Sequence, residues 1–91
     1  MSSLSREVTI TNKLGLHARA SARLVRVASQ FQSVVTLSKD GMSVNGKSIL
    51  GMLTLAATRG STILVTCDGA DQVGAMTAVI DCIQSNFGEG E

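Results

Sequence analysis

The sequence predicts an α+β fold in which three helices cover one face of a mainly antiparallel, four-stranded sheet. Three observations lead to this prediction: four short segments alternate in polarity, three longer ones repeat apolar residues every three or four positions, and Asp-Gly or Asn-Gly pairs punctuate the chain. The expected element order is β-α-β-β-α-β-α. Because no repeat, linker or low-complexity tract interrupts it, residues 1–91 are expected to form one domain.

The chain is expected to begin with a strand and an amphipathic helix. Val8–Thr11 alternates in polarity and is β-branched throughout, which is typical of a half-buried strand. Between His17 and Phe31 the period changes to that of a helix. Its apolar face holds Ala20, Leu24, Val27, Ala28 and Phe31, and its polar face holds Arg19, Arg23, Arg26 and Gln30.

A hairpin and a short helix are expected next. Val34–Lys39 and Met42–Val44 are predicted to pair because Asp40-Gly41 favours a hairpin turn. Ser48 suits the N-cap of a helix that runs to about Thr58 and ends at the glycine that follows. Apolar side chains cover nearly all sides of this helix, which is more than one small core needs.

A strand and a helix complete the predicted fold. Thr62–Asp68 alternates again, with its apolar residues on one face. The last helix has Asp71 near its positive N-terminal end and is expected to end at Gly88. Its apolar face holds Val73, Met76, Ile80, Ile83 and Phe87.

Composition argues against several classes of function. Eight basic and seven acidic residues give a formal net charge of +1, too balanced for a nucleic-acid-binding protein, and aromatic residues make up only 2%. Cys67 and Cys82 lack metal-ligand spacing and are interpreted as small buried residues, so no metal or cofactor is expected. No apolar run reaches the roughly 20 residues of a membrane span and no signal peptide is evident, which predicts a cytoplasmic protein without membrane contact.

The charged residues are unevenly distributed along the chain. Lys13 and the three arginines of the first helix cluster without an acidic residue among them, whereas every charged residue after Arg59 is acidic. The first region is therefore expected to bind an anion or an acidic surface.

The residues with the clearest chemical potential are Gly15-Leu16-His17-Ala18-Arg19, where a strand gives way to a helix. The positive end of a helix disfavours imidazolium, so His17 is expected to be neutral and nucleophilic. Backbone N–H groups and Arg19 could bind a phosphoryl group on the ring, and Gly15 would permit a turn with positive φ. The alternative is that His17 only caps the helix.

Two motifs resemble one known family. Asn12-Lys13-Leu14-Gly15-Leu16-His17-Ala18-Arg19 is similar to the signature of the histidine-containing phosphocarriers, the HPr family of the phosphotransferase system, and Val44 to Gly51 is similar to its second motif. The resemblance implies an open-faced β-sandwich and a monomeric carrier rather than a stand-alone catalyst. It further implies that enzyme I, using phosphoenolpyruvate, phosphorylates His17 on Nδ1, that Arg19 stabilises the phosphate, and that an A-type enzyme II accepts it.

One departure from the family pattern bears on the pathway. Ala20 stands where proline typically follows the arginine, and a proline there would pre-organise the first turn without taking part in the chemistry. With the Asn12-Lys13-Leu14 lead-in and the Phe87–Glu91 tail, it makes the chain most similar to NPr, the carrier subgroup of the nitrogen-regulatory branch. The sugar-transport branch remains the alternative.

Two other interpretations compete with the carrier. Gly41–Ser48 matches the P-loop pattern G-x-x-x-x-G-K-S, but a hairpin is expected within it, which argues against nucleotide hydrolysis. A docking module without covalent chemistry would use the basic and apolar residues that a carrier would also use to bind partners, namely Arg23, Arg26, Ile49, Leu50 and Leu53. Ser48 is a helix cap and, since it matches a serine modified by a dedicated kinase in some HPr proteins, a candidate regulatory phosphorylation site.

Overall fold

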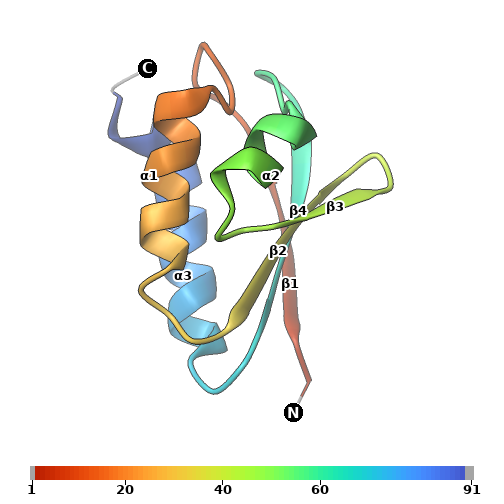
Figure 1. The fold of residues 1–91 in the computed structure, drawn as a ribbon, viewed down its shortest axis with the longest axis vertical. Coiled ribbons are helices and arrows are strands. Elements are labelled where there is room, and N and C mark those ends of the chain that lie inside the picture. Colours follow the sequence, from red (N-terminus) through yellow and green to blue (C-terminus); the bar gives the residue numbers. More distant parts are fainter. Residues whose placement is uncertain (1, 90–91) are drawn as a thin grey trace.

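Four antiparallel strands form one sheet, and the helices pack on one of its faces, in the computed structural model, which describes residues 2–89 (Figure 1). The strands are β1 (Leu4–Thr9), β2 (Val34–Lys39), β3 (Met42–Asn45) and β4 (Thr62–Asp68), and their order in the sheet is β1-β4-β2-β3. The helices are α1 (Ala18–Ala28), α2 (Ile49–Leu55) and α3 (Gln72–Gln84), followed by the 3-10 turn η1 (Asn86–Gly88). This arrangement and element order confirm the predicted fold class.

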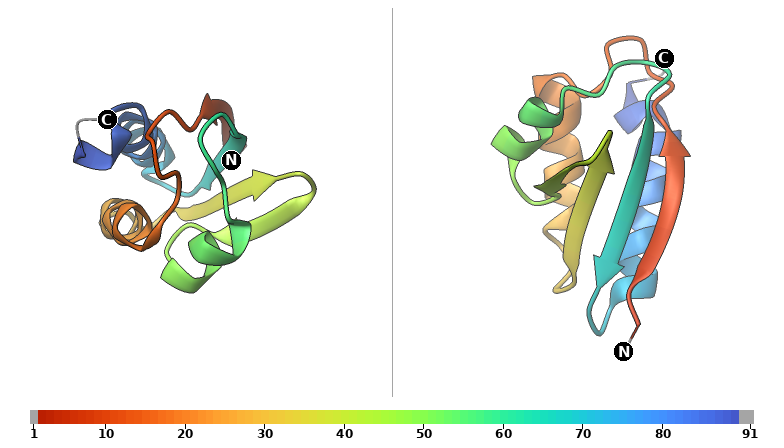
Figure 2. Two further views of the ribbon diagram at one scale, coloured as in Figure 1. Left: turned by 90° about the horizontal axis from the view of Figure 1, so that it is seen from above. Right: turned by 90° about the vertical axis from the view of Figure 1, so that its right-hand side faces the viewer.

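The sheet joins segments that are far apart in the sequence. Leu4 of β1 pairs with Cys67 of β4, and Val34 of β2 pairs with Asp68 at the end of the same strand. As predicted, β4 alternates, because Ile63, Val65 and Cys67 are fully buried between the sheet and the helices. Figure 2 shows the opposite face of the sheet uncovered by the described residues.

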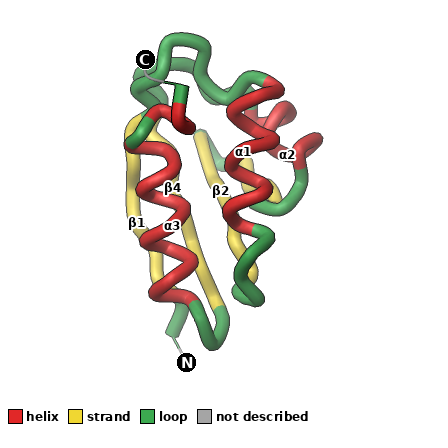
Figure 3. Tube along the Cα trace, turned by 90° about the vertical axis from the view of Figure 1, so that its left-hand side faces the viewer, coloured by secondary structure: helices red, strands yellow, loops and turns green. Residues whose placement is uncertain are grey.

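The core lies between the sheet and the pair formed by α1 and α3, which run side by side over it (Figure 3). From α1, Ala20, Leu24 and Ala28 are completely buried, so the predicted apolar face is confirmed at these three positions. Both cysteines are buried and free, and desolvation raises the pKa of each thiol. Burial of these apolar side chains is the main force that holds the layers together.

Two elements in the first half have different ends from those predicted. β1 begins at Leu4 instead of Val8 and ends at Thr9, because β4 offers hydrogen-bonding partners along this whole segment. Pairing with a central strand thus overrides the weak strand propensity of Ser5 and Arg6. α1 ends at Ala28, and the predicted continuation to Phe31 is wrong because tight turns replace the helical hydrogen bonds there.

The helices of the second half also end earlier than predicted. α2 ends at Leu55 rather than near Thr58, because Ala56 adopts the left-handed conformation, with φ of 53°, and its N–H donates to the Met52 carbonyl. α3 ends at Gln84, and the chain then forms η1 before it reaches the predicted end. The prediction that Val73 belongs to the apolar face of α3 is wrong. Val73 lies in the first turn of α3 and is 69% exposed, and the first buried residue of this helix is Ala75.

None of the helices in the described part of the chain has the length and apolar character needed to span a bilayer. Gly90 and Glu91, which belong to the tail cited in the comparison with NPr, lie outside the described residues.

Asp71 joins the start of α3 to the loop between α1 and β2. Its carboxylate accepts hydrogen bonds from the Ser33 hydroxyl and from the backbone amides of Gln32 and Ser33, rather than capping α3 with its side chain. These bonds, that of the Ser33 hydroxyl first, lower the pKa of Asp71 below its ordinary value of 3.8. The carboxylate therefore contributes stability in its ionised form.

Replacing Asp71 by asparagine is expected to weaken the dependence of folding stability on acid pH. A carboxyl group with a lowered folded-state pKa stabilises the protein fully above its unfolded pKa, and loses that contribution as the pH falls through the lower folded value. The Tm difference between wild type and D71N should therefore be constant near neutral pH and shrink below 3.8. The exposed neighbour Asp68 supplies the control: D68N should leave the acid dependence of Tm unchanged, and an equal effect of the two substitutions would contradict the role of Asp71.

Candidate functional site

The candidate site begins in the loop between β1 and α1. Gly15 lies in this loop with φ of 64°, and a Cβ atom there would stand 2.4 Å from the carbonyl oxygen of Ala57. The next amide, that of Leu16, donates a 2.9 Å hydrogen bond to the same carbonyl. The loop is therefore seated on the segment between α2 and β4, with no space for a side chain at Gly15.

His17 is the N-cap residue of α1. Its backbone is extended, with φ of −75° and ψ of 178°, and its carbonyl accepts the first helical hydrogen bond, from the Ser21 amide at 2.8 Å. Within residues 2–89 the imidazole makes no capping bond to the helix. The imidazole therefore does not cap α1, although the position of His17 in the sequence is compatible with that role.

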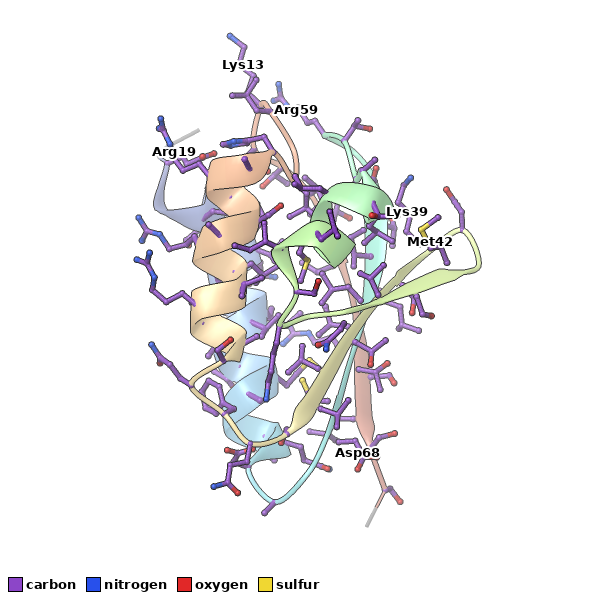
Figure 4. The ribbon with its side chains drawn as sticks, viewed as in Figure 1. Lys13, Arg19, Lys39, Met42, Arg59 and Asp68 are labelled. Atoms are coloured by element: carbon purple, nitrogen blue, oxygen red, sulfur yellow. The ribbon has the colours of Figure 1, made fainter. Side chains whose placement is uncertain are left out.

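The imidazole borders a hollow of about 810 Å³ at one end of the molecule. The hollow is lined by Lys13, Leu14, His17, Ala18, Arg19, Arg23, Phe87, Gly88 and Glu89. Figure 4 shows Lys13 and Arg19 at this end and Asp68 at the opposite end. Since the N–H groups of the first helical turn lack intrahelical acceptors, cationic side chains and a helix N-terminus meet at one place, and such a place suits an anion.

Two residues with no role in the sequence-based prediction contribute to the site. The Glu89 carboxylate lies beside the imidazole, with Oε2 at 2.7 Å from Nε2 of His17. Asn12, completely buried, donates from Nδ2 to the Gly15 carbonyl at 2.8 Å and to Oε1 of Glu89 at 3.3 Å. Asn12 was part of the quoted motif and Glu89 part of the quoted tail, but no spacing in the sequence indicates that they meet.

The contact between His17 and Glu89 is a close polar contact rather than a well-formed hydrogen bond. The Glu89 oxygen lies off the direction of the ring N–H, and Nε2 has no hydrogen-bond partner within the described residues. We find no hydrogen bond to the other ring nitrogen, Nδ1, among residues 2–89, and Nδ1 is not one of their buried unpaired polar atoms. Nε2 therefore faces protein, and Nδ1 is the nitrogen left for other chemistry.

The structure separates the remaining predicted site residues into two groups. Arg23 lines the hollow with His17 and Arg19, whereas Arg26 is exposed on α1 away from it. The apolar residues lie on α2, which packs beside α1, and their exposed fractions are 44% for Ile49, 74% for Leu50 and 41% for Leu53. We refer to these three residues as the α2 patch.

Ser48 is the N-cap of α2, as predicted, because its hydroxyl oxygen accepts a 3.0 Å hydrogen bond from the Gly51 amide. The preceding residue, Lys47, donates from Nζ to the Phe31 carbonyl at 2.7 Å. This lysine therefore ties the end of the α1 region to the turn before α2.

The P-loop pattern does not form a nucleotide-binding loop here. Gly41–Ser48 contains the whole of β3, as predicted from its hairpin signal. The ammonium group of Lys47, which would contact a phosphate in a P-loop, donates a hydrogen bond to the Phe31 carbonyl instead. Among residues 2–89, no group of three or more His, Cys, Asp or Glu side chains could hold a metal ion.

Comparisons with known proteins agree with this geometry. Residues 4–85 match the family described as PTS-HPr, the PTS HPr component phosphorylation site. The phosphocarrier protein HPr of Neisseria meningitidis serogroup A is 51% identical over 88 residues, which cover 97% of this chain and 99% of that protein, and the HPr of Cupriavidus necator matches equally well.

Two solved structures share the whole fold. HPr from Thermoanaerobacter tengcongensis superposes with a TM-score of 0.89 at 39% sequence identity, covering 98% of both chains. HPr from Bacillus anthracis superposes with a TM-score of 0.88 at 36% identity, covering 92% of this chain and 100% of that one.

Proposed function

Because the chain belongs to the HPr family of phosphocarrier proteins of the phosphotransferase system, we propose that His17 accepts a phosphoryl group from phosphorylated enzyme I. His17 then passes the group to an A-type enzyme II protein or domain. The protein is a carrier and not a stand-alone catalyst, so the two partners supply the rest of each active site.

The observation that supports this role most directly is the position of the imidazole. It stands at the N-terminus of α1, makes no capping bond to the helix among residues 2–89, and lies at the edge of a hollow that three basic side chains line. The ring is a quarter exposed, which leaves it accessible to a partner's active site. A histidine with only a structural role would need neither an accessible ring nor a hollow lined by basic side chains.

In the proposed reaction, the lone pair of Nδ1 attacks phosphorus and forms the Nδ1–P bond. The bond between phosphorus and its donor atom on enzyme I breaks, and its electron pair returns to that donor. In the second transfer the Nδ1–P bond breaks, and its electron pair returns to Nδ1. The phosphoryl oxygens are negatively charged throughout, so the α1 N-terminus and the neighbouring guanidinium stabilise them.

Arg19 is the residue we propose as the main phosphate stabiliser. It lines the hollow from the first turn of α1, and its side chain is exposed. A charge-assisted hydrogen bond is worth roughly 1.5–3 kcal/mol, so Arg19→Ala should slow transfer to and from His17 at least about tenfold. Substitution of an exposed side chain should leave the unfolding free energy within about 0.5 kcal/mol of wild type.

The matched control for Arg19 is Arg6, an exposed arginine on β1. Arg6→Ala removes the same charge from the molecule, and rapid-quench measurement should give it the wild-type transfer rate. Equal rates for both variants and wild type would remove Arg19 from the proposed chemistry.

The same proposal assigns partner binding to the α2 patch together with Arg23 and Arg26. The α2 patch exposes apolar surface next to α1, and the two arginines add positive charge on the neighbouring helix. Such a surface fits a partner with an apolar centre and an acidic rim.

We also propose Ser48 as the site of a regulatory kinase. A phosphate on Ser48, next to Ile49, would place about two negative charges at the edge of this surface and weaken docking.

Within the system, we propose the nitrogen-regulatory branch, on the basis of Ala20, the Asn12-Lys13-Leu14 lead-in and the tail. The test is incubation with labelled phosphoenolpyruvate and enzyme I from each branch. We expect one acid-labile, base-stable phosphoryl group per chain, acquired faster from the nitrogen-branch enzyme. Faster labelling by the sugar-branch enzyme would reverse the branch assignment, and no label from either would leave a docking module as the better description.

A further inference from the structure

We propose that Glu89 is a positioning residue that holds the proton of His17 on Nε2 and so presents Nδ1 as the nucleophile. This inference rests on the proposed function, because it concerns how His17 carries out the transfer. It extends that function by assigning a role in phosphoryl transfer to Glu89, which is far in the sequence from the motif around His17.

The first step in the argument is the distance between the two groups. Oε2 of Glu89 and Nε2 of His17 are 2.7 Å apart, and the two side chains are only 19% and 25% exposed. A lone pair on Nε2 repels a carboxylate oxygen this close, whereas the partial positive charge of an N–H group on Nε2 attracts it even when the oxygen lies off the N–H direction. The contact therefore selects the imidazole tautomer with Nε2–H, which leaves the lone pair on Nδ1.

The second step is that Glu89 is itself held in place. Its other oxygen, Oε1, accepts a hydrogen bond from Nδ2 of Asn12, which also donates to the Gly15 carbonyl. Both acceptors require the amide nitrogen at this position, so the orientation of the Asn12 side chain follows from its partners. Asn12 is completely buried, and it thereby ties the carboxylate to the loop that carries His17.

The third step concerns the other charges around the ring. Lys13 from the loop, and Arg19 and Arg23 from α1, line the same hollow and disfavour a positive ring, as does the N-terminus of α1. Arg59, on the segment against which the loop packs, is exposed and does not line the hollow. Within residues 2–89, Glu89 is the acidic residue in the lining, so it is the group there that can compensate a positive imidazole.

The fourth step is the balance of charge during transfer. When the Nδ1–P bond forms, the proton stays on Nε2, and the ring therefore changes from neutral to cationic. When that bond breaks toward the acceptor, the electron pair returns to Nδ1 and the ring becomes neutral again. A fixed carboxylate beside Nε2 stabilises the charge that develops, without receiving a proton in either direction.

The spectroscopic test compares Glu89→Ala with wild type in the unphosphorylated state. ¹⁵N chemical shifts of the neutral ring should show wild-type His17 protonated on Nε2 and bare on Nδ1. In Glu89→Ala the two shifts should move toward each other as the second tautomer becomes populated. Unchanged ring shifts in the variant would overturn the inference, and this measurement needs no enzyme I.

The kinetic test measures phosphorylation by enzyme I as a function of carrier concentration. Glu89→Ala should lower kcat about tenfold while KM stays near the wild-type value, and Glu7→Ala, which removes an exposed carboxylate on β1, should change neither. A raised KM with an unchanged kcat would show that Glu89 acts only in docking and would overturn the proposal. Failure of wild type to label at His17 would instead defeat the proposed function, so the two failures are distinguishable.

Discussion

Replacing His17 by alanine is expected to abolish phosphoryl transfer from enzyme I completely. The sequence contains one histidine, so no second imidazole can take its place. A phosphoramidate hydrolyses in acid and survives in base, so label that is lost in acid but retained after alkaline treatment, measured by mass spectrometry, reports on a phosphoramidate. The change in signal is the largest we expect from any single substitution.

The fold should survive this substitution. The His17 side chain makes no capping bond to α1 within the described residues, and its backbone carbonyl still accepts the Ser21 amide after the change. Circular dichroism and an unfolding curve close to wild type would therefore accompany the loss of label. An alanine variant that still takes up a full equivalent of alkali-stable phosphate would refute the assignment of His17.

Replacing Gly15 by alanine is expected to cause the largest loss of stability. A left-handed φ costs an alanine roughly 1–2 kcal/mol, and its Cβ would stand 2.4 Å from the Ala57 carbonyl oxygen and 2.9 Å from Cα of Thr58. Both atoms belong to the backbone and cannot rotate away, so overpacking adds roughly 1–3 kcal/mol. The unfolding free energy should thus fall by about 3 kcal/mol, out of roughly 5–15 kcal/mol for a typical domain.

Gly41 separates the two causes of that loss. Its φ is 82°, but no described atom lies within 4 Å of the position that a Cβ would take. Gly41→Ala should therefore show only the conformational cost, measured as a smaller shift of the denaturation midpoint at an unchanged m-value. If both substitutions shift the midpoint equally, the close packing of the loop against Ala57 is not important for stability.

The order of the elements could be predicted from the sequence because its signals are local. The Asp40-Gly41 turn, the alternation of Thr62–Asp68 and the Ser48 cap each depend on residues within a few positions of one another. The ends of β1 and α2 could not be predicted in the same way. β1 extends to Leu4 because a distant strand pairs with it, and α2 stops at Ala56, which has no intrinsic preference for the left-handed conformation found there.

The candidate site divides along the same line. The position of His17 at a helix start follows from the motif around it, and the structure places it at the N-cap of α1. Glu89 reaches the site from 77 positions beyond Asn12, and no periodicity relates two such residues. Asp71 was expected only to interact with the positive N-terminal end of α3. Its carboxylate instead accepts hydrogen bonds from the loop before β2, a contact that depends on tertiary structure.

The strand order also governs when the sheet can form during synthesis. β1 is made first, but its partner β4 is made last of the strands, and a ribosome adds roughly 5–20 residues per second. Leu4–Thr9 thus waits about 3 to 12 seconds for Thr62–Asp68, while the local β2–β3 hairpin can already close. Because the last strand to be made, β4, fills an interior position between β1 and β2, folding is expected to finish in one late step whose rate is limited by long-range chain closure.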